Sequence, residues 1–125
     1  MRTVLLLGVA GALGSMARYG LSALVGHWTG NAFPWGIFVV NVLGCFLFGA
    51  IWAGLGVFHL LDDAARIVLL TGFMGAVSTV SSFLFDSDVM LRNGDWGALA
   101  LNLVGQIVLG LAALRAGAAL AMRLV

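Results

Sequence analysis

The chain has 125 residues, of which 62% are hydrophobic and only 9% are charged, and its formal net charge is +1. A soluble domain carries about 25% charged residues, so the composition excludes a water-soluble fold and predicts an all-α integral membrane protein. The length accommodates four spans of roughly 20–25 residues as a single transmembrane domain over residues 1–125, and the near-neutral charge does not indicate a nucleic-acid partner.

The first predicted span covers about residues 3–25. We treat it as a membrane helix and not as a signal peptide, because no clear small-residue cleavage site follows its apolar run. Gly8, Gly11 and Gly14 recur every three residues, which puts small residues on one face for close helix contact. Arg18 falls late in this span, where an arginine is costly unless it reaches the interface or faces protein and water. It either snorkels to the interface or lines an anion vestibule.

The second predicted span covers about residues 34–57 and starts at Pro34, the one proline, which favours the first turn of a helix. Asn41 is its one strongly polar side chain and lies about two turns into the span. A buried asparagine in a membrane must find hydrogen-bond partners. Asn41 therefore either joins two helices, or lines a pore or stabilises an interruption in a neighbouring helix.

A turn over residues 58–65, with helix-start acids at Asp62 and Asp63, leads into the third predicted span, about residues 64–92. This segment is longer than one crossing needs, and residues 72–83 combine two glycines with four hydroxyl side chains. Because lipid leaves no water to satisfy free backbone groups, such a patch is where we expect the helix to open and offer its main chain to ions. The residues of the patch are Gly72, Gly75, Ser78, Thr79, Ser81 and Ser82.

Polar residues also occur on both sides of the next turn. Phe83 follows the expected break and either packs or presents its positive ring edge to an anion. Asp86 and Asp88 then reach the aqueous edge. The fourth predicted span, about residues 96–122, carries Asn102 and Gln106 one helical turn apart on one face. Three spans thus place polar residues at comparable depth.

Four spans put both termini on one side of the membrane, and the arginines favour neither side strongly. Insertion in both orientations, giving an antiparallel pair, is compatible with this distribution. A single bundle of four helices is too small to enclose a wet path with a full polar lining. We therefore expect an oligomer, which small and polar helix faces can stabilise.

Three segments resemble one known family. They are residues 11–19 (Gly-Ala-Leu-Gly-Ser-Met-Ala-Arg-Tyr), residues 34–49, from Pro-Trp-Gly to Phe-Gly with Asn41 between, and residues 72–83 (Gly-Phe-Met-Gly-Ala-Val-Ser-Thr-Val-Ser-Ser-Phe). In this order and at this chain length they resemble the Fluc/CrcB fluoride channels. The resemblance implies an antiparallel, dual-topology homodimer in the inner (plasma) membrane. It also implies passive, selective export of fluoride that lowers its toxicity, and a structural sodium ion on the dimer axis.

The resemblance also implies roles for individual residues. The backbone carbonyls of Gly75 and Ser78 from both subunits would hold the sodium ion. Arg18 would match the vestibule arginine, and Asn41 and Phe83 would match a pore asparagine and a pore phenylalanine. Thr79, Ser81 and Ser82 would belong to a hydroxyl track in the anion path.

This chain departs from the family pattern in three places. The second pore phenylalanine is Val80, a threonine of the second motif is Ile37, and the hydroxyl face of the fourth helix appears as Asn102, Gln106 and Gly110. A valine has no polarised ring edge, so Phe83 alone suffices, the pore has another register, or a related partner subunit in a heterodimer supplies the ring. The amide N–H groups of Asn102 and Gln106 can also solvate an anion in compensation.

Two other functions remain open. A small dual-topology exporter of the multidrug type is also a four-span dimer, but it usually needs a membrane-embedded carboxylate for proton coupling, and none of the aspartates falls at mid-span. In a non-transporting membrane assembly protein, the polar faces would only hold helices together. An enzyme is least expected, because no nucleophile–base pair or metal-ligand cluster is visible.

Overall fold

The computed structural model describes residues 1–30, 32–58 and 62–124, without the side chains of residues 56–58, so part of the turn predicted over 58–65 lies outside the described residues. The described chain is all-helical, and four of its helices are long and apolar enough to cross a membrane. The first crossing is α1 (Arg2–Thr29) and the second is α2 (Trp35–Phe58). The third consists of α3 (Asp63–Ile67), the π-helix η1 (Val68–Met74), α4 (Gly75–Val77) and α5 (Val80–Asn93). The fourth consists of α6 (Trp96–Ala100), the π-helix η2 (Leu101–Gly105) and α7 (Gln106–Arg123).

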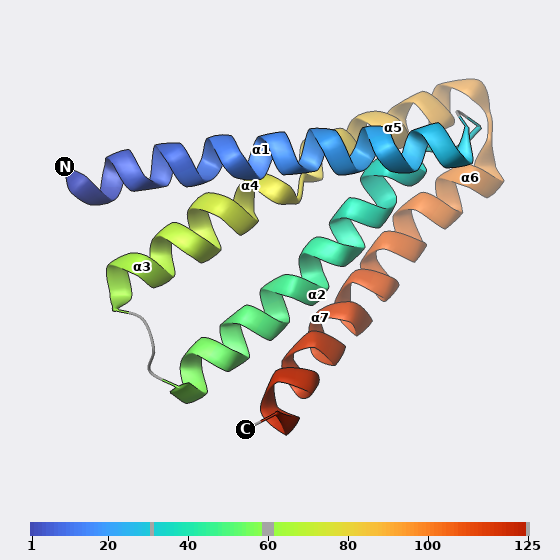
Figure 1. Ribbon diagram of the computed structural model, residues 1–125. Helices are drawn as coiled ribbons and strands as arrows, with labels where there is room; N and C mark the ends of the chain where they lie inside the picture. The colour runs from blue at the N-terminus through green and yellow to red at the C-terminus, as the bar shows by residue number, and fades with distance from the viewer. Residues whose placement is uncertain (31, 59–61, 125) are drawn as a thin grey trace.

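Short turns join the crossings, and hydrogen bonds between residues close in sequence stabilise the helix ends beside them. Helix α1 continues past residue 25 to Thr29, whose hydroxyl donates to the carbonyl of Val25 at 2.9 Å. It ends at Gly30, which adopts a left-handed φ of 74° that a glycine tolerates best. Asp62 caps α3 by accepting from the N–H of Ala65 at 2.8 Å, as expected for a helix-start acid. The turns after α1 and after α5 lie at one end of the molecule, and the beginning of α1 and the end of α7 lie toward the other (Figure 1).

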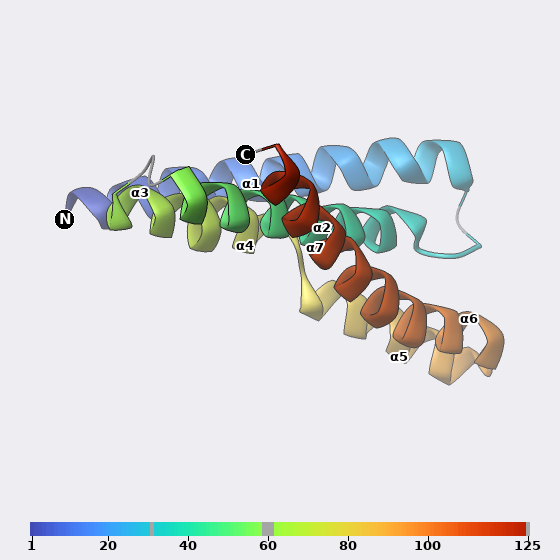
Figure 2. The ribbon, with the colours of Figure 1, turned by 90° about the horizontal axis from the view of Figure 1, so that it is seen from below.

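The third crossing changes direction in its middle. Ser78 (φ −86°, ψ 151°) and Thr79 (φ −146°, ψ 121°) are both extended. Helix α4 therefore stops at Val77 and α5 starts at Val80 with Thr79 as its N-cap. Helix α1 packs on η1 and α4, and Figure 1 shows α3 diverging from α1, whereas α5 leaves in another direction toward α6 (Figure 2). The predicted interruption within residues 72–83 is confirmed, and it consists of the two hydroxyl residues Ser78 and Thr79.

Glycines set how closely the helices approach. Helices α2 and α7 make the most extensive contact in the molecule and run side by side. A Cβ on Gly49 would overlap the Leu114 carbonyl oxygen of α7, and a Cβ on Gly117 would overlap the Phe46 carbonyl oxygen of α2. This reciprocal contact brings the two backbones together, as small residues do in membrane helix pairs.

Only part of the predicted glycine face of α1 contacts another helix. A Cβ on Gly14 would overlap the Phe73 carbonyl oxygen and would lie 2.9 Å from the Cβ of Ala76, so Gly14 lets α1 pack directly on η1 and α4. Gly11 lies at the edge of this contact, and a Cβ on Gly8 would have no neighbour within 4 Å. Helix α1 therefore meets the third crossing next to the break and diverges from it toward the N-terminus.

We predict that Gly117→Ala lowers the free energy of unfolding by about 1–3 kcal/mol, because the added methyl meets a backbone oxygen that cannot move aside. Gly8→Ala is the matched control, since it adds the same methyl on α1 where there is open space. Unfolding of the purified protein in detergent, followed by circular dichroism, measures both. Equal effects of the two substitutions would show that the α2–α7 contact is not close-packed.

Candidate functional site

A side chain pairs with the backbone at the break in the third crossing. The Thr79 N–H donates to Oδ1 of Asn41 at 2.8 Å, and Nδ2 of Asn41 donates to the Thr79 carbonyl at 3.1 Å. An extended residue inside a span has lost its helical partners, and lipid supplies no water in their place. The amide of Asn41 therefore satisfies both main-chain groups of Thr79, as a neighbouring β-strand would. Of the roles open to Asn41, the geometry displays stabilisation of an interruption, and the contact with Gln106 also joins two helices.

Asn41 is also the first member of a longer hydrogen-bonded series. Its Nδ2 donates to Oε1 of Gln106 at 2.7 Å, and Nε2 of Gln106 donates to Oδ1 of Asn102 at 2.7 Å. Nδ2 of Asn102 donates to Oγ of Ser87 at 2.9 Å, and the Ser87 hydroxyl donates to the Phe83 carbonyl at 2.8 Å. We call Asn41, Gln106, Asn102 and Ser87 the polar chain. The polar residues that the sequence placed at comparable depth on three spans are thus in direct contact.

The hydroxyl residues gather at the first turn of α5. Oγ1 of Thr79 accepts from the Ser82 N–H at 3.3 Å, lies 3.0 Å from Oγ of Ser81 and donates to Oγ of Ser82 at 3.3 Å. Ser78 is not part of this cluster, and its hydroxyl lies 3.5 Å from the Met74 carbonyl at the end of η1. The N-terminal end of a helix carries partial positive charge, so the cluster of Thr79, Ser81 and Ser82 lies where an anion is favoured.

The end of α4 offers carbonyl groups instead. The last carbonyls of a helix have no N–H partner in the following turn, and α4 ends at Val77. Gly75 is exposed, so no side chain shields its main chain. Among the residues that the structure describes, no group of three or more His, Cys, Asp or Glu could hold a metal ion. The carbonyls at the end of α4 and the exposed main chain of Gly75 are oxygen groups of the kind that a hard cation can take as ligands.

Three further residues from the sequence analysis lie around the break. Phe83 is half-buried on the first turn of α5, and its carbonyl anchors Ser87 and, at 3.4 Å, Nδ2 of Asn102. Val80 is 70% exposed. Arg18 is half-buried on α1, and the one ion pair among the described residues, Arg92–Asp88 at 2.7 Å, does not include it.

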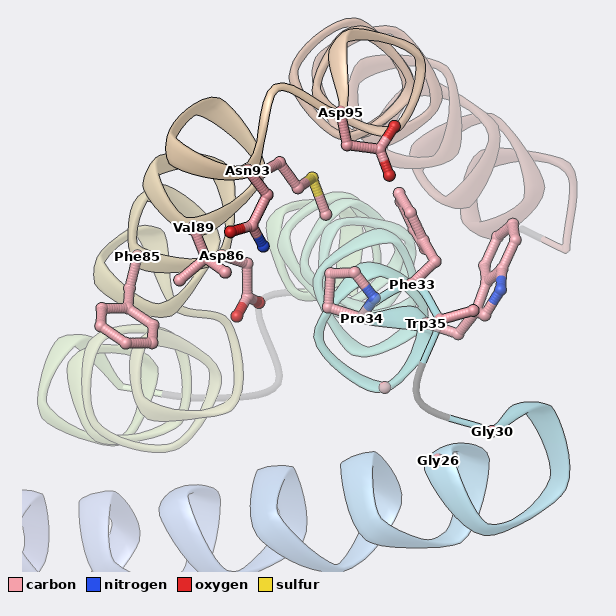
Figure 3. Close-up of a pocket in the computed structure, with 13 residues that line it drawn as sticks. Gly26, Gly30, Phe33, Pro34, Trp35, Phe85, Asp86, Val89, Asn93 and Asp95 are labelled. Atoms are coloured by element: carbon pink, nitrogen blue, oxygen red, sulfur yellow. The ribbon is translucent and has the colours of Figure 1, made fainter.

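A pocket of about 420 Å³ opens between the end of α1, the start of α2 and α5. Figure 3 shows Asp86 and Asn93 on one wall and Phe33, Pro34 and Trp35 on the opposite wall. Oδ2 of Asp86 is buried and makes no hydrogen bond to a described residue. Asp88 is 46% exposed in its ion pair, whereas Asp86 lies in the wall of the pocket, and their position at an aqueous edge stays a prediction.

Ser87 is the member of the site that sequence reasoning missed. It is only 7% exposed, and it connects Asn102 to the third crossing. A signal was present in the chain, because α5 and α6 are joined by a tight turn at Gly94, which has a φ of 71°. In such an antiparallel pair, residues at similar distances from the turn face each other, and Ser87 and Asn102 lie on opposite sides of Gly94 at similar separations.

Comparison of the sequence with protein families and with known proteins points to one family. The model of the family described as "CrcB-like protein, Camphor Resistance (CrcB)" matches residues 5–118. The chain is 50% identical over 117 residues to the fluoride-specific ion channel FluC of Nitratidesulfovibrio vulgaris, with 94% of each chain covered. It is 53% identical over 114 residues to the FluC channel of Solidesulfovibrio magneticus, with 91% of each chain covered.

We predict that Asn41→Leu lowers the free energy of unfolding by about 1–3 kcal/mol, because it leaves the Thr79 main chain and Oε1 of Gln106 without partners. Asn93→Leu is the control, since Asn93 is an exposed asparagine at the end of α5. Unfolding in detergent compares the two variants with the parent protein. A loss no greater than that of Asn93→Leu would mean that Asn41 does not stabilise the break.

Proposed function

Because the chain belongs to the family of CrcB-like proteins, we propose that it is a fluoride-specific ion channel that spans a membrane. The observation that carries this proposal is the close similarity, over nearly the whole chain, to channels of that specificity. We propose that flow is passive and that it carries fluoride out of the cytoplasm across the inner membrane, which lowers its toxicity. A passive path needs no catalytic group.

The chemistry of the break suits a small, strongly hydrated anion, because a pore must replace the water around the ion with other donors. Hydroxyls, amides and ring edges can do so without trapping the ion as a fixed charge would. We place the anion path along the first turn of α5 and the polar chain behind it, with Arg18 at a vestibule. The residues of this proposed path are Asn41, Thr79, Val80, Ser81, Ser82, Phe83, Asn102 and Gln106.

The exposed surface around the break, which we call the break face, includes Gly75, Val80 and Ser81. This surface also supports assembly of two copies. Gly75 at the start of α4 and Val80 and Ser81 at the start of α5 are all exposed, on the two sides of the break. An exposed hydroxyl and a bare main chain in mid-span fit protein or water better than lipid. We propose that a second copy, inserted in the opposite orientation, covers this face and completes the path. A related subunit in a heterodimer is the second arrangement, because Val80 leaves room for a ring from a partner.

A sodium ion between the two copies would have a structural role. We assign its ligands to the carbonyls of Gly75 and Ser78 from each copy, since α4 ends here and Gly75 is exposed. These oxygens are neutral dipoles, and oxygen ligands suit a hard cation. A bound cation supplies positive charge that offsets the cost of an anion nearby.

Purified protein in liposomes should release trapped fluoride and retain trapped chloride, when valinomycin and potassium balance the charge. Asn41→Asp should slow fluoride release by about tenfold or more, because a carboxylate in the path repels the anion and cannot donate to Gln106. A fluoride electrode and a chloride electrode measure the two fluxes.

Protein-free liposomes provide the baseline for this assay, and Asn93→Leu provides a variant control. Equal release of both halides would reject a selective pore. An absence of fluoride release would favour an assembly protein, and release only under a proton gradient would favour an exporter.

A further inference from the structure

The polar chain starts and ends on the main chain of the third crossing. At one end the Thr79 N–H donates to Asn41 at 2.8 Å, and at the other end Ser87 donates to the Phe83 carbonyl at 2.8 Å. Between these ends the chain passes through Asn41 on α2 and through Gln106 and Asn102 on the fourth crossing. The polar chain therefore connects Thr79, at the break, to α5, and it does so through side chains of the second and fourth crossings.

The two ends give the chain a direction. A backbone N–H can only donate and a backbone carbonyl can only accept, so the Thr79 end and the Phe83 end have fixed polarity. Each side chain between them accepts from the preceding member and donates to the following one. These partners decide which side of each amide of Asn41, Gln106 and Asn102 is the oxygen and which is the nitrogen. None of the three amides can turn over alone without losing hydrogen bonds.

Burial makes this direction hard to reverse. Asn102 is fully buried, and Ser87, Thr79 and Gln106 are each at most 9% exposed. If Asn41 turned over, its NH₂ group would face the Thr79 N–H, and a donor would meet a donor. No neighbouring water can replace the lost partner where the atoms are buried, so such a turn leaves the Thr79 N–H and Oε1 of Gln106 unsatisfied.

We infer that Ser87, Asn102 and Gln106 are positioning residues that hold the Asn41 amide in the one orientation that pairs with the break. Both hydrogens of Nδ2 of Asn41 are already committed, one to Gln106 and one to the Thr79 carbonyl. Within one protomer Asn41 then has no free N–H for fluoride, and the contacts fall to the other members of the proposed path, such as the hydroxyls of Ser81 and Ser82. The expected effect on fluoride flow rests on the proposed function, whereas the expected effect on the hydrogen bonds of the Thr79 main chain does not.

Ser87→Ala tests this inference at the end of the chain farthest from the break. It removes the acceptor that Nδ2 of Asn102 reaches at 2.9 Å and leaves that nitrogen only the longer contact with the Phe83 carbonyl at 3.4 Å, so the end of the polar chain is weakened while the fold is expected to survive. Ser87→Thr keeps the hydroxyl and serves as the rescue variant. Ser22→Ala is the matched control, because the hydroxyl of Ser22 is buried and has no partner among the described residues.

Two measurements are made on these variants in lipid nanodiscs and liposomes. Hydrogen exchange by NMR should show the Thr79 amide exchanging about tenfold faster in Ser87→Ala, the size of one lost hydrogen bond, with the amides of α2 and α7 unchanged. Fluoride release should fall in the same variant, and Ser87→Thr should restore both values. Ser22→Ala should match the parent protein.

An unchanged Thr79 amide in Ser87→Ala would overturn the inference. An equal rise in exchange across all helices would also overturn it, because Ser87 would then act only on global stability. If the parent protein releases no fluoride, the proposed function fails, and the exchange pattern still decides whether Ser87 positions Asn41.

Discussion

The hydrogen-bonded pair between Asn41 and the main chain of Thr79 is the interaction on which this structure depends. A helix inside a membrane satisfies its own backbone, and an interruption gives up that property. Here the lost partners of Thr79 are replaced by one amide that accepts at 2.8 Å and donates at 3.1 Å. The third crossing can therefore change direction and expose main-chain and hydroxyl groups without leaving the freed backbone of Thr79 unpaired.

The helix packing serves this pair. The amides of Asn41 and Gln106 meet at 2.7 Å, which requires the second and fourth crossings to lie close together. Gly49 and Gly117 permit that approach, because any larger residue would meet a carbonyl oxygen of the facing helix. Gly14 plays the same part for α1 against the first half of the third crossing. The glycines thus determine backbone distances, and the polar side chains then determine which groups pair.

Sequence reasoning reached the architecture and the location of the site, but not its hydrogen-bond partners. Hydropathy gives the depth of a residue, so the spans, the break within residues 72–83 and the common depth of Asn41 and Gln106 were predictable. Choice of partner depends on the rotation and crossing of each helix, which hydropathy does not report. The pairing of Asn41 with the Thr79 backbone and the role of Ser87 therefore required a structure, as did the open space beside Gly8.

The opening of the third crossing at Ser78 and Thr79 must persist in a membrane if Asn41 acts as described. Solid-state NMR of labelled protein in lipid bilayers reports it directly, because ¹³Cα and ¹³Cβ chemical shifts distinguish extended from helical backbone. We expect extended values at both residues, in line with their ψ angles of 151° and 121°, between helical values at Met74 and Leu84. Helical shifts at Ser78 and Thr79, continuous with their neighbours, would contradict the opening of the helix and the pairing with Asn41.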